Sequence, residues 1–178
     1  MKYADEVEYI VTNPRRNEFI KNLTLDLKGN TLVLYNFVEK HGIPLHKLIS
    51  DHAQEGRKVF FVSGGVDTET REAIRATTET EDNAIIVASY GTFSTGINIR
   101  NLHNVVFTSP SKSRIRNLQS IGRGLRKGNG KTSAVLYDIA DDLRYKTCKQ
   151  SENNTACFCN LKMFATFAAH CGQNGNNS

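Results

Sequence analysis

The chain has 178 residues, enough for one domain with a hydrophobic core, and 39% of them are apolar. No stretch approaches the roughly 18 consecutive apolar residues of a membrane span, and the polar start lacks a signal-peptide core, so we expect a cytoplasmic protein without a membrane segment. The net charge of +5 is compatible with a polyanionic partner but is too small to identify a nucleic-acid-binding protein.

Helices and strands are expected to alternate along most of the chain. A first helix is predicted over 13–29, because Asn13 can cap it and Pro14 suits its first position. Short apolar runs without polar alternation predict buried strands at 31–36, 58–63, 84–89, 104–109 and 134–138. Helices are predicted between them at 45–55, at 67–80 with Asp67 as the cap, and at 113–126.

This alternation predicts an α/β fold. Buried strands separated by helices form a mainly parallel sheet, and right-handed crossovers cover both of its faces to give a three-layer sandwich. Ligands of such sheets bind at the carboxyl ends of the strands. The segments that begin at Ser63, Ser89 and Ser109 are expected to emerge there.

Residues 145–178 differ in composition from residues 1–144, so we predict a domain over 1–144 and an atypical tail over 145–178. The polar end of the tail is typical of disorder. An apolar stripe leaves open one packed helix before the disordered end; its members are Leu161, Phe164, Ala168 and Cys171. The four cysteines all follow residue 147, in the pattern C-x8-C-x-C-x11-C, which fits structural zinc poorly.

Two glycine-rich patterns resemble nucleotide-binding motifs, but neither contains all the residues that its motif requires. Gly130-Lys131-Thr132 ends like a P-loop, but Leu125 stands where the first glycine is required, and a strand rather than a helix is expected to follow. A dinucleotide fingerprint that begins at Gly122 lacks its third glycine, because position 127 is lysine. The chain therefore has no P-loop of its own.

The segment QSIGRGLR, residues 119–126, places two arginines three residues apart. Arg123 and Arg126 would share a helix face and could converge on one phosphate, while the intervening glycine permits close approach. By itself such a segment is more typical of a solvated basic helix end.

Its context carries a resemblance. Q-x-x-G-R-x-x-R resembles motif VI of superfamily 2 helicases, and SYGTFSTGINI at 89–99 resembles motif V. VFFVSGG at 59–65 and TLVLYN at 31–36 resemble motifs IVa and IV, in the family's order and spacing. Within the superfamily the chain is similar to phage recombination and repair DNA helicases. It departs from the usual motif V at Asn98, where relatives have aspartate, and at Arg100, where they have proline.

The resemblance implies a RecA-like lobe of the P-loop NTPase type that lacks its own P-loop: the second motor lobe. ATP and Mg²⁺ would be held mainly by the absent first lobe, the N-terminal partner. Arg126 would be the arginine finger and Arg123 its γ-phosphate partner. Gly96 and Asn98 would approach the ribose and phosphates, and Gln119 would couple the nucleotide cleft to the nucleic-acid track.

The resemblance also implies contacts with branched or single-stranded DNA, in the host cytoplasm for a phage-encoded protein. Hydroxyls and backbone amides grip phosphates without reading sequence. These donors are Ser63, Gly64, Gly65, Ser89 and Thr92. A basic cluster follows the strand at 104–109, and it is equally typical of a solvated face; its members are Lys112, Arg114 and Arg116.

Two other functions stay open. One is a complete small enzyme such as a nucleotide-binding hydrolase, although the chain lacks a P-loop, a nucleophile elbow and a Rossmann fingerprint. The other is a non-catalytic nucleic-acid-binding module with a helicase-like fold. DNA-stimulated ATP hydrolysis that requires the first lobe would favour a motor lobe over both of these alternatives.

Overall fold

A computed structural model describes residues 3–94, 99, 101–109, 133–141 and 159–168. Its helices are α1 (Tyr3–Thr12), α2 (Pro14–Asp26), the π-helix η1 (Val38–Gly42), α3 (Ile43–His52), α4 (Thr68–Thr80) and α5 (Tyr90–Ser94). Its strands are β1 (Thr31–Tyr35), β2 (Val59–Val62), β3 (Ile85–Ser89), β4 (Asn104–Phe107), β5 (Ser133–Asp141) and β6 (Cys159–Ala168). The helix predicted at 113–126 lies outside the described residues.

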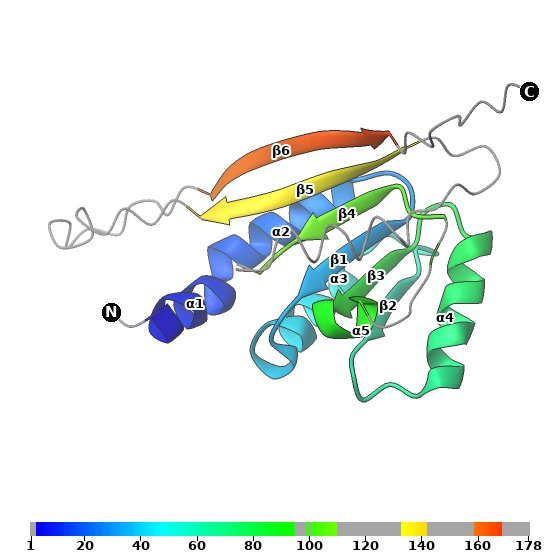
Figure 1. The fold of residues 1–178 in the computed structure, drawn as a ribbon, viewed down its shortest axis with the longest axis horizontal. Coiled ribbons are helices and arrows are strands. Elements are labelled where there is room, and N and C mark those ends of the chain that lie inside the picture. Colours follow the sequence, from blue (N-terminus) through cyan, green and yellow to red (C-terminus); the bar gives the residue numbers. More distant parts are fainter. Residues whose placement is uncertain (1–2, 95–98, 100, 110–132, 142–158, 169–178) are drawn as a thin grey trace, which may run out of the picture.

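The strands form one sheet in the order β2-β3-β1-β4-β5-β6. Strands β1 to β5 are parallel, whereas β6 runs antiparallel to β5. In Figure 1 the arrowheads of the parallel strands point toward the end of the molecule where α1 and α5 lie. This parallel arrangement confirms the sheet predicted from the apolar runs, and it gathers the carboxyl ends of β1 to β4 along one edge.

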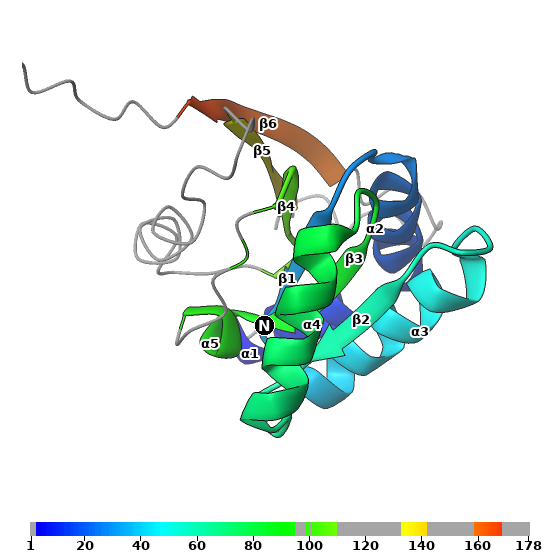
Figure 2. The ribbon, with the colours of Figure 1, turned by 90° about the vertical axis from the view of Figure 1, so that its right-hand side faces the viewer.

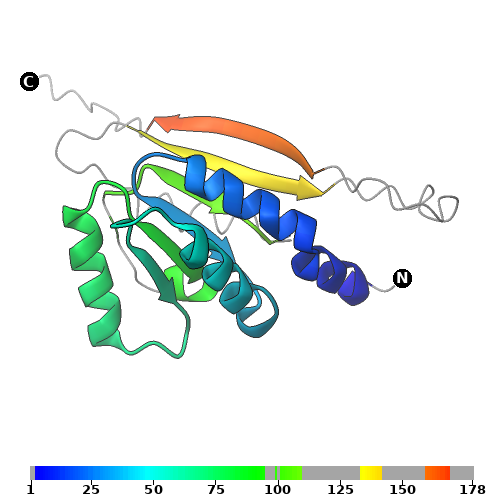
Figure 3. The same ribbon diagram turned by 180° about the vertical axis from the view of Figure 1, so that it is seen from behind.

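Helices cover both faces of the sheet, so the predicted three-layer sandwich is confirmed. Figure 2 shows α2 and α3 on one side and α4 and α5 on the other, and from behind α2 and α3 lie over the sheet while α1 extends toward the N-terminus (Figure 3). Ile20 of α2 and Leu45 and Ile49 of α3 pack against strand residues on one face of the sheet. Ile74 and Phe93 pack under the opposite layer, so each layer buries its own apolar face.

Local capping begins α2 and α4 as the sequence predicted. The Asn13 side chain accepts a hydrogen bond from the Arg16 amide at 3.2 Å, with Pro14 at the first helical position. The Asp67 carboxylate accepts from the Thr70 amide at 2.8 Å. Helix α2 ends with its C-cap Leu27, which is extended, and Gly29 then takes φ +89°, a left-handed conformation in the turn that leads into β1.

The tail prediction is wrong at 159–168. The apolar stripe that includes Leu161, Phe164 and Ala168 suggested a helix, but this segment is strand β6, with Leu136 opposite Phe164 in the register. Pairing satisfies the backbone groups along the edge of β5, which a helix would leave open. The boundary between a 1–144 domain and a 145–178 tail stays a prediction.

Three helices were not predicted: α1, η1 and α5. Each is short, at ten, five and five residues, so tertiary contacts rather than a long apolar period stabilise it. Among the described residues, no helix is both long and apolar enough to cross a membrane.

Candidate functional site

The carboxyl ends of β2 and β3 bring two of the predicted phosphate-binding segments together. Ser63 directly follows β2, Ser89 is the last residue of β3, and the two strands are neighbours in parallel register. A Cβ atom built on Gly64 would lie 4.0 Å from the Thr92 hydroxyl, so the loop after β2 touches the start of α5. The predicted group Ser63, Gly64, Gly65, Ser89 and Thr92 is therefore one cluster in space.

Within this cluster the Ser89 and Thr92 hydroxyls are 2.7 Å apart, and the Thr92 amide donates to the Ser89 oxygen at 3.2 Å. Ser89 is half-buried and Thr92 is 5% exposed. Ser89 is thus the more exposed residue of the two, and the amide and hydroxyl of Thr92 both contact its hydroxyl oxygen and orient it. This division of roles follows from the structure and was not apparent from the sequence.

The loop after β2 is a tight turn that exposes backbone. The Val66 amide donates to the Ser63 carbonyl at 3.1 Å, and Gly64 and Gly65 are exposed. The next amides are less available, because Asp67 caps α4 and its carboxylate takes both the amide and the hydroxyl of Thr70. The Thr70 amide holds the pKa of Asp67 below its usual range. A phosphate here would therefore meet the glycine amides rather than the α4 terminus.

A second, buried cluster joins the carboxyl ends of β1 and β4. The Asn36 amide donates to the Ser109 hydroxyl oxygen at 3.2 Å, and Nδ1 of His41 lies 3.1 Å from the same oxygen. The Arg16 guanidinium donates to the Thr108 carbonyl at 2.7 Å. Arg16 and His41 were missed by sequence reasoning. The available signal was a cation in the first turn of a helix, where the macrodipole disfavours positive charge.

His41 lies in an unusual environment. It is fully buried in η1, and its Nε2 atom has no hydrogen-bond partner among the described residues. Burial, and secondarily the positive charge of Arg16, lowers the pKa of His41 to about 3. The ring is therefore neutral at physiological pH.

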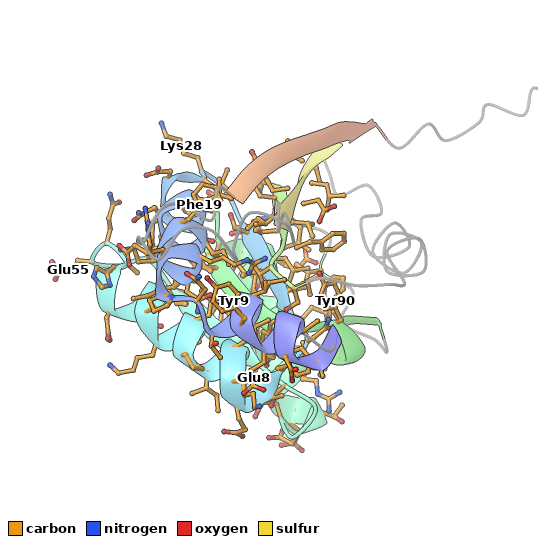
Figure 4. The ribbon with its side chains drawn as sticks, turned by 90° about the vertical axis from the view of Figure 1, so that its left-hand side faces the viewer. Glu8, Tyr9, Phe19, Lys28, Glu55 and Tyr90 are labelled. Atoms are coloured by element: carbon orange, nitrogen blue, oxygen red, sulfur yellow. The ribbon has the colours of Figure 1, made fainter. Side chains whose placement is uncertain are left out.

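The remaining predicted site residues lie outside the described residues, and their roles stay predictions. These are Gly96, Asn98, Lys112, Arg114, Arg116, Gln119, Arg123 and Arg126. The described residues contain no group of three His, Cys, Asp or Glu side chains that could hold a metal ion. Figure 4 looks onto the end of the molecule where α1 and α5 lie, with Tyr9 on α1 and Tyr90 at the start of α5.

Comparison with known proteins identifies relatives. A family model described as "Helicase conserved C-terminal domain" matches residues 15–128. The chain is 42% identical over 147 residues to the ATP-dependent DNA helicase uvsW of Enterobacteria phage T4. This match covers 81% of this chain and 28% of that protein. The crystal structure of T4 UvsW matches at 36% identity with a TM-score of 0.66, covering 92% of this chain and 32% of that one.

A more distant match shows the fold alone. The C-terminal part of the Fun30 ATPase domain is 17% identical, with a TM-score of 0.57 over 79% of this chain and 46% of that one. The chain spans about 28% of the length of its curated relative, so the activity of a whole protein does not follow from the match. The matched residues 15–128 include all four helicase-like segments found in the sequence, and the chain belongs to the helicase C-terminal domain family, as a RecA-like second lobe.

Proposed function

We propose that this chain is the second motor lobe of an ATP-dependent DNA helicase or translocase that acts on branched or single-stranded DNA in recombination and repair. Its 42% identity to a phage ATP-dependent DNA helicase supports the reaction and the substrate. The observation that carries the proposal is the joint cluster of Ser63, Gly64, Gly65, Ser89 and Thr92 at the carboxyl edge. Hydroxyls and exposed glycine amides at one edge suit a DNA backbone, whose phosphates carry no sequence information.

The nucleotide contacts are assigned from the motif match. Arg126 stabilises the negative charge on the transferring γ-phosphoryl group, and Arg123 binds beside it. Gly96, Asn98 and Gln119 line the same cleft. ATP and Mg²⁺ belong mainly to the first lobe, so ATP would close the two lobes and its hydrolysis would reopen them. By the same assignment, Lys112, Arg114 and Arg116 contact the DNA backbone.

The test compares the chain alone with a fusion of the chain to a first helicase lobe. The purified 178-residue chain alone is expected to hydrolyse no ATP and to bind DNA weakly at most. Fused to a first lobe, it is expected to show DNA-stimulated ATPase activity, which Arg126→Ala lowers by roughly 10³- to 10⁵-fold. Arg75→Ala is the matched control, because Arg75 lies on α4 in an exposed pair with Glu72, at 2.7 Å.

Two results would overturn this proposal. Turnover by the isolated chain that disappears in Arg126→Ala would show a complete enzyme. A folded fusion that binds DNA without hydrolysing ATP would favour a non-catalytic nucleic-acid-binding module.

A further inference from the structure

The glycine turn after β2 carries a carboxylate close to the amides to which phosphate binding is assigned. The Val66 amide donates to the Ser63 carbonyl at 3.1 Å, which closes the turn over Gly64 and Gly65. Asp67 comes next in the chain, so its Cα atom lies within roughly 7 Å of that of Gly65. Asp67 and both glycines are exposed. A phosphate that binds the glycine amides therefore also approaches a negative charge.

The carboxylate of Asp67 is held in its ionised form. Its two oxygens accept hydrogen bonds from the amide and the hydroxyl of Thr70, each at 2.8 Å. These bonds, the amide's first, lower the pKa of Asp67. A nearby phosphate favours the protonated form, but a carboxyl group whose pKa starts below about 3.9 stays charged near pH 7.

Capping of α4 does not require this charge. In α2 the neutral side chain of Asn13 does the same work, accepting from the Arg16 amide at 3.2 Å. Asparagine and aspartate are about equally good caps. The charge of Asp67 also favours α4 through the helix dipole, so stability and DNA affinity have to be measured separately.

The rest of the turn only partly offsets the carboxylate. Arg71 donates from Nε to the Val66 carbonyl at 2.8 Å, which holds its guanidinium group beside the turn. Glu69 adds a second exposed acidic side chain in the first turn of α4. Residues 63–71 therefore have a formal charge of −1, in a chain whose net charge is +5. A segment selected only for tight phosphate binding would be basic.

We propose that Asp67 determines DNA affinity: its negative charge weakens the hold of the glycine turn on the phosphate backbone, so that the turn can release DNA between steps. This role rests on the proposed function, because it takes the turn as a DNA contact. A unit charge roughly 7 Å away changes an affinity by about threefold at the dielectric constant of water, and by more at a protein surface.

The test separates the charge of Asp67 from its capping. Asp67→Asn and Asp67→Ser keep a capping side chain and remove the charge, whereas Asp67→Glu keeps the charge without a preferred cap. Glu55→Gln is the matched control, because it removes one exposed carboxylate from the turn between α3 and β2. Figure 4 shows Glu55 on the opposite side of the molecule from Tyr90, the first residue of α5.

Each variant is fused to a first lobe, and its Kd for a single-stranded oligonucleotide is measured by fluorescence anisotropy. At about 0.1 M salt, Asp67→Asn and Asp67→Ser are expected to bind about 3- to 10-fold more tightly than Glu55→Gln. At about 0.5 M salt the gain should shrink, because salt screens exposed charges. Asp67→Glu is expected to keep the wild-type Kd, and thermal unfolding checks that each variant is folded at the assay temperature.

The Kd values and the ATPase activity keep the two proposals apart. A wild-type fusion without DNA-stimulated ATPase refutes the proposed function, while tighter binding by Asp67→Asn than by Glu55→Gln would still support the role of the charge. An active fusion in which these two variants have equal Kd values overturns that role. Weaker binding by Asp67→Glu with unchanged binding by Asp67→Asn would also overturn it, because the cap rather than the charge would then set the affinity.

Discussion

Replacing Gly42 by alanine would drive a methyl group into the ring of Tyr35. A Cβ atom at Gly42 would lie 2.5 Å from two ring carbons and 2.8 Å from a third, whereas ordinary contacts between carbon atoms are about 3.5–4.0 Å. The ring has little room to move. It is fully buried, stacks on Phe61 with the ring planes 2° apart, and donates its hydroxyl hydrogen to the Val62 carbonyl at 3.2 Å.

Gly42→Ala must therefore either displace η1 or break the Tyr35 hydrogen bond. Overpacking of this kind costs about 1–3 kcal/mol. For a chain of this length, about 2 kcal/mol corresponds to a fall in Tm of roughly 4–8 °C. Urea unfolding followed by circular dichroism measures the loss, with an unchanged slope m as the sign that the unfolded state is unaffected.

Gly91→Ala is the matched control, because a Cβ atom there meets nothing within 4 Å and Gly91 lies in α5. That change is expected to be neutral or to stabilise by up to about 1 kcal/mol, since alanine favours helix. The double variant Gly42→Ala/Tyr35→Leu tests the contact, because removing the ring should recover part of the loss. Wild-type stability of Gly42→Ala would refute the reasoning, as would equal losses with and without the Tyr35 ring.

Two further predictions concern buried polar groups. Because the pKa of His41 is lowered to about 3 in the folded chain, the unfolded chain binds more protons below its own pKa of about 6.5; the contribution of His41 is complete above that pH and is lost as the pH falls toward 3. From about pH 7 to about pH 5.5, urea unfolding should show that wild type loses about 1 kcal/mol more than His41→Asn, and equal losses would contradict the shift. Asn30→Ala should cost about 2–4 kcal/mol, because the Asn30 side chain accepts from the Ala84 amide at 2.8 Å and donates to the carbonyls of Thr78 and Asn101 at 3.0 and 2.8 Å, all of which would lose this partner. If Asn30→Ala lowers the free energy of unfolding by less than about 0.5 kcal/mol in the same assay, these groups have found other partners.

Much of the central fold was predictable because its signals are local. The apolar runs at 31–36 and 84–89 have no polar alternation, which is typical of a strand covered on both faces, and they are β1 and β3. The capping side chains of Asn13 and Asp67 accept hydrogen bonds from the amides three residues later. The starts of α2 and α4 could therefore also be predicted from the local sequence.

Where local signals competed, the sequence was misleading. The stripe at 161–171 has helical spacing, but Leu161, Met163, Ala165 and Phe167 also alternate at the period of a strand. The choice depended on an open edge of β5, whose existence is a property of the whole sheet. Similarly, η1 depends on Gly42 lying against Tyr35, a contact between two different elements.

The candidate site divides in the same way. Sequence alone determined which residue types stand at the strand ends, because motif order and strand prediction depend on neighbours along the chain. On that basis, and on the family resemblance, Ser63, Gly64, Gly65, Ser89 and Thr92 were predicted to bind phosphate, and this role stays a prediction. Only the tertiary structure showed that Thr92 orients Ser89, and that Arg16 and His41, 92 and 68 residues from their partners Thr108 and Ser109, hold the end of β4. Burial and long-range hydrogen bonds arise when distant segments pack together, and no local pattern records them.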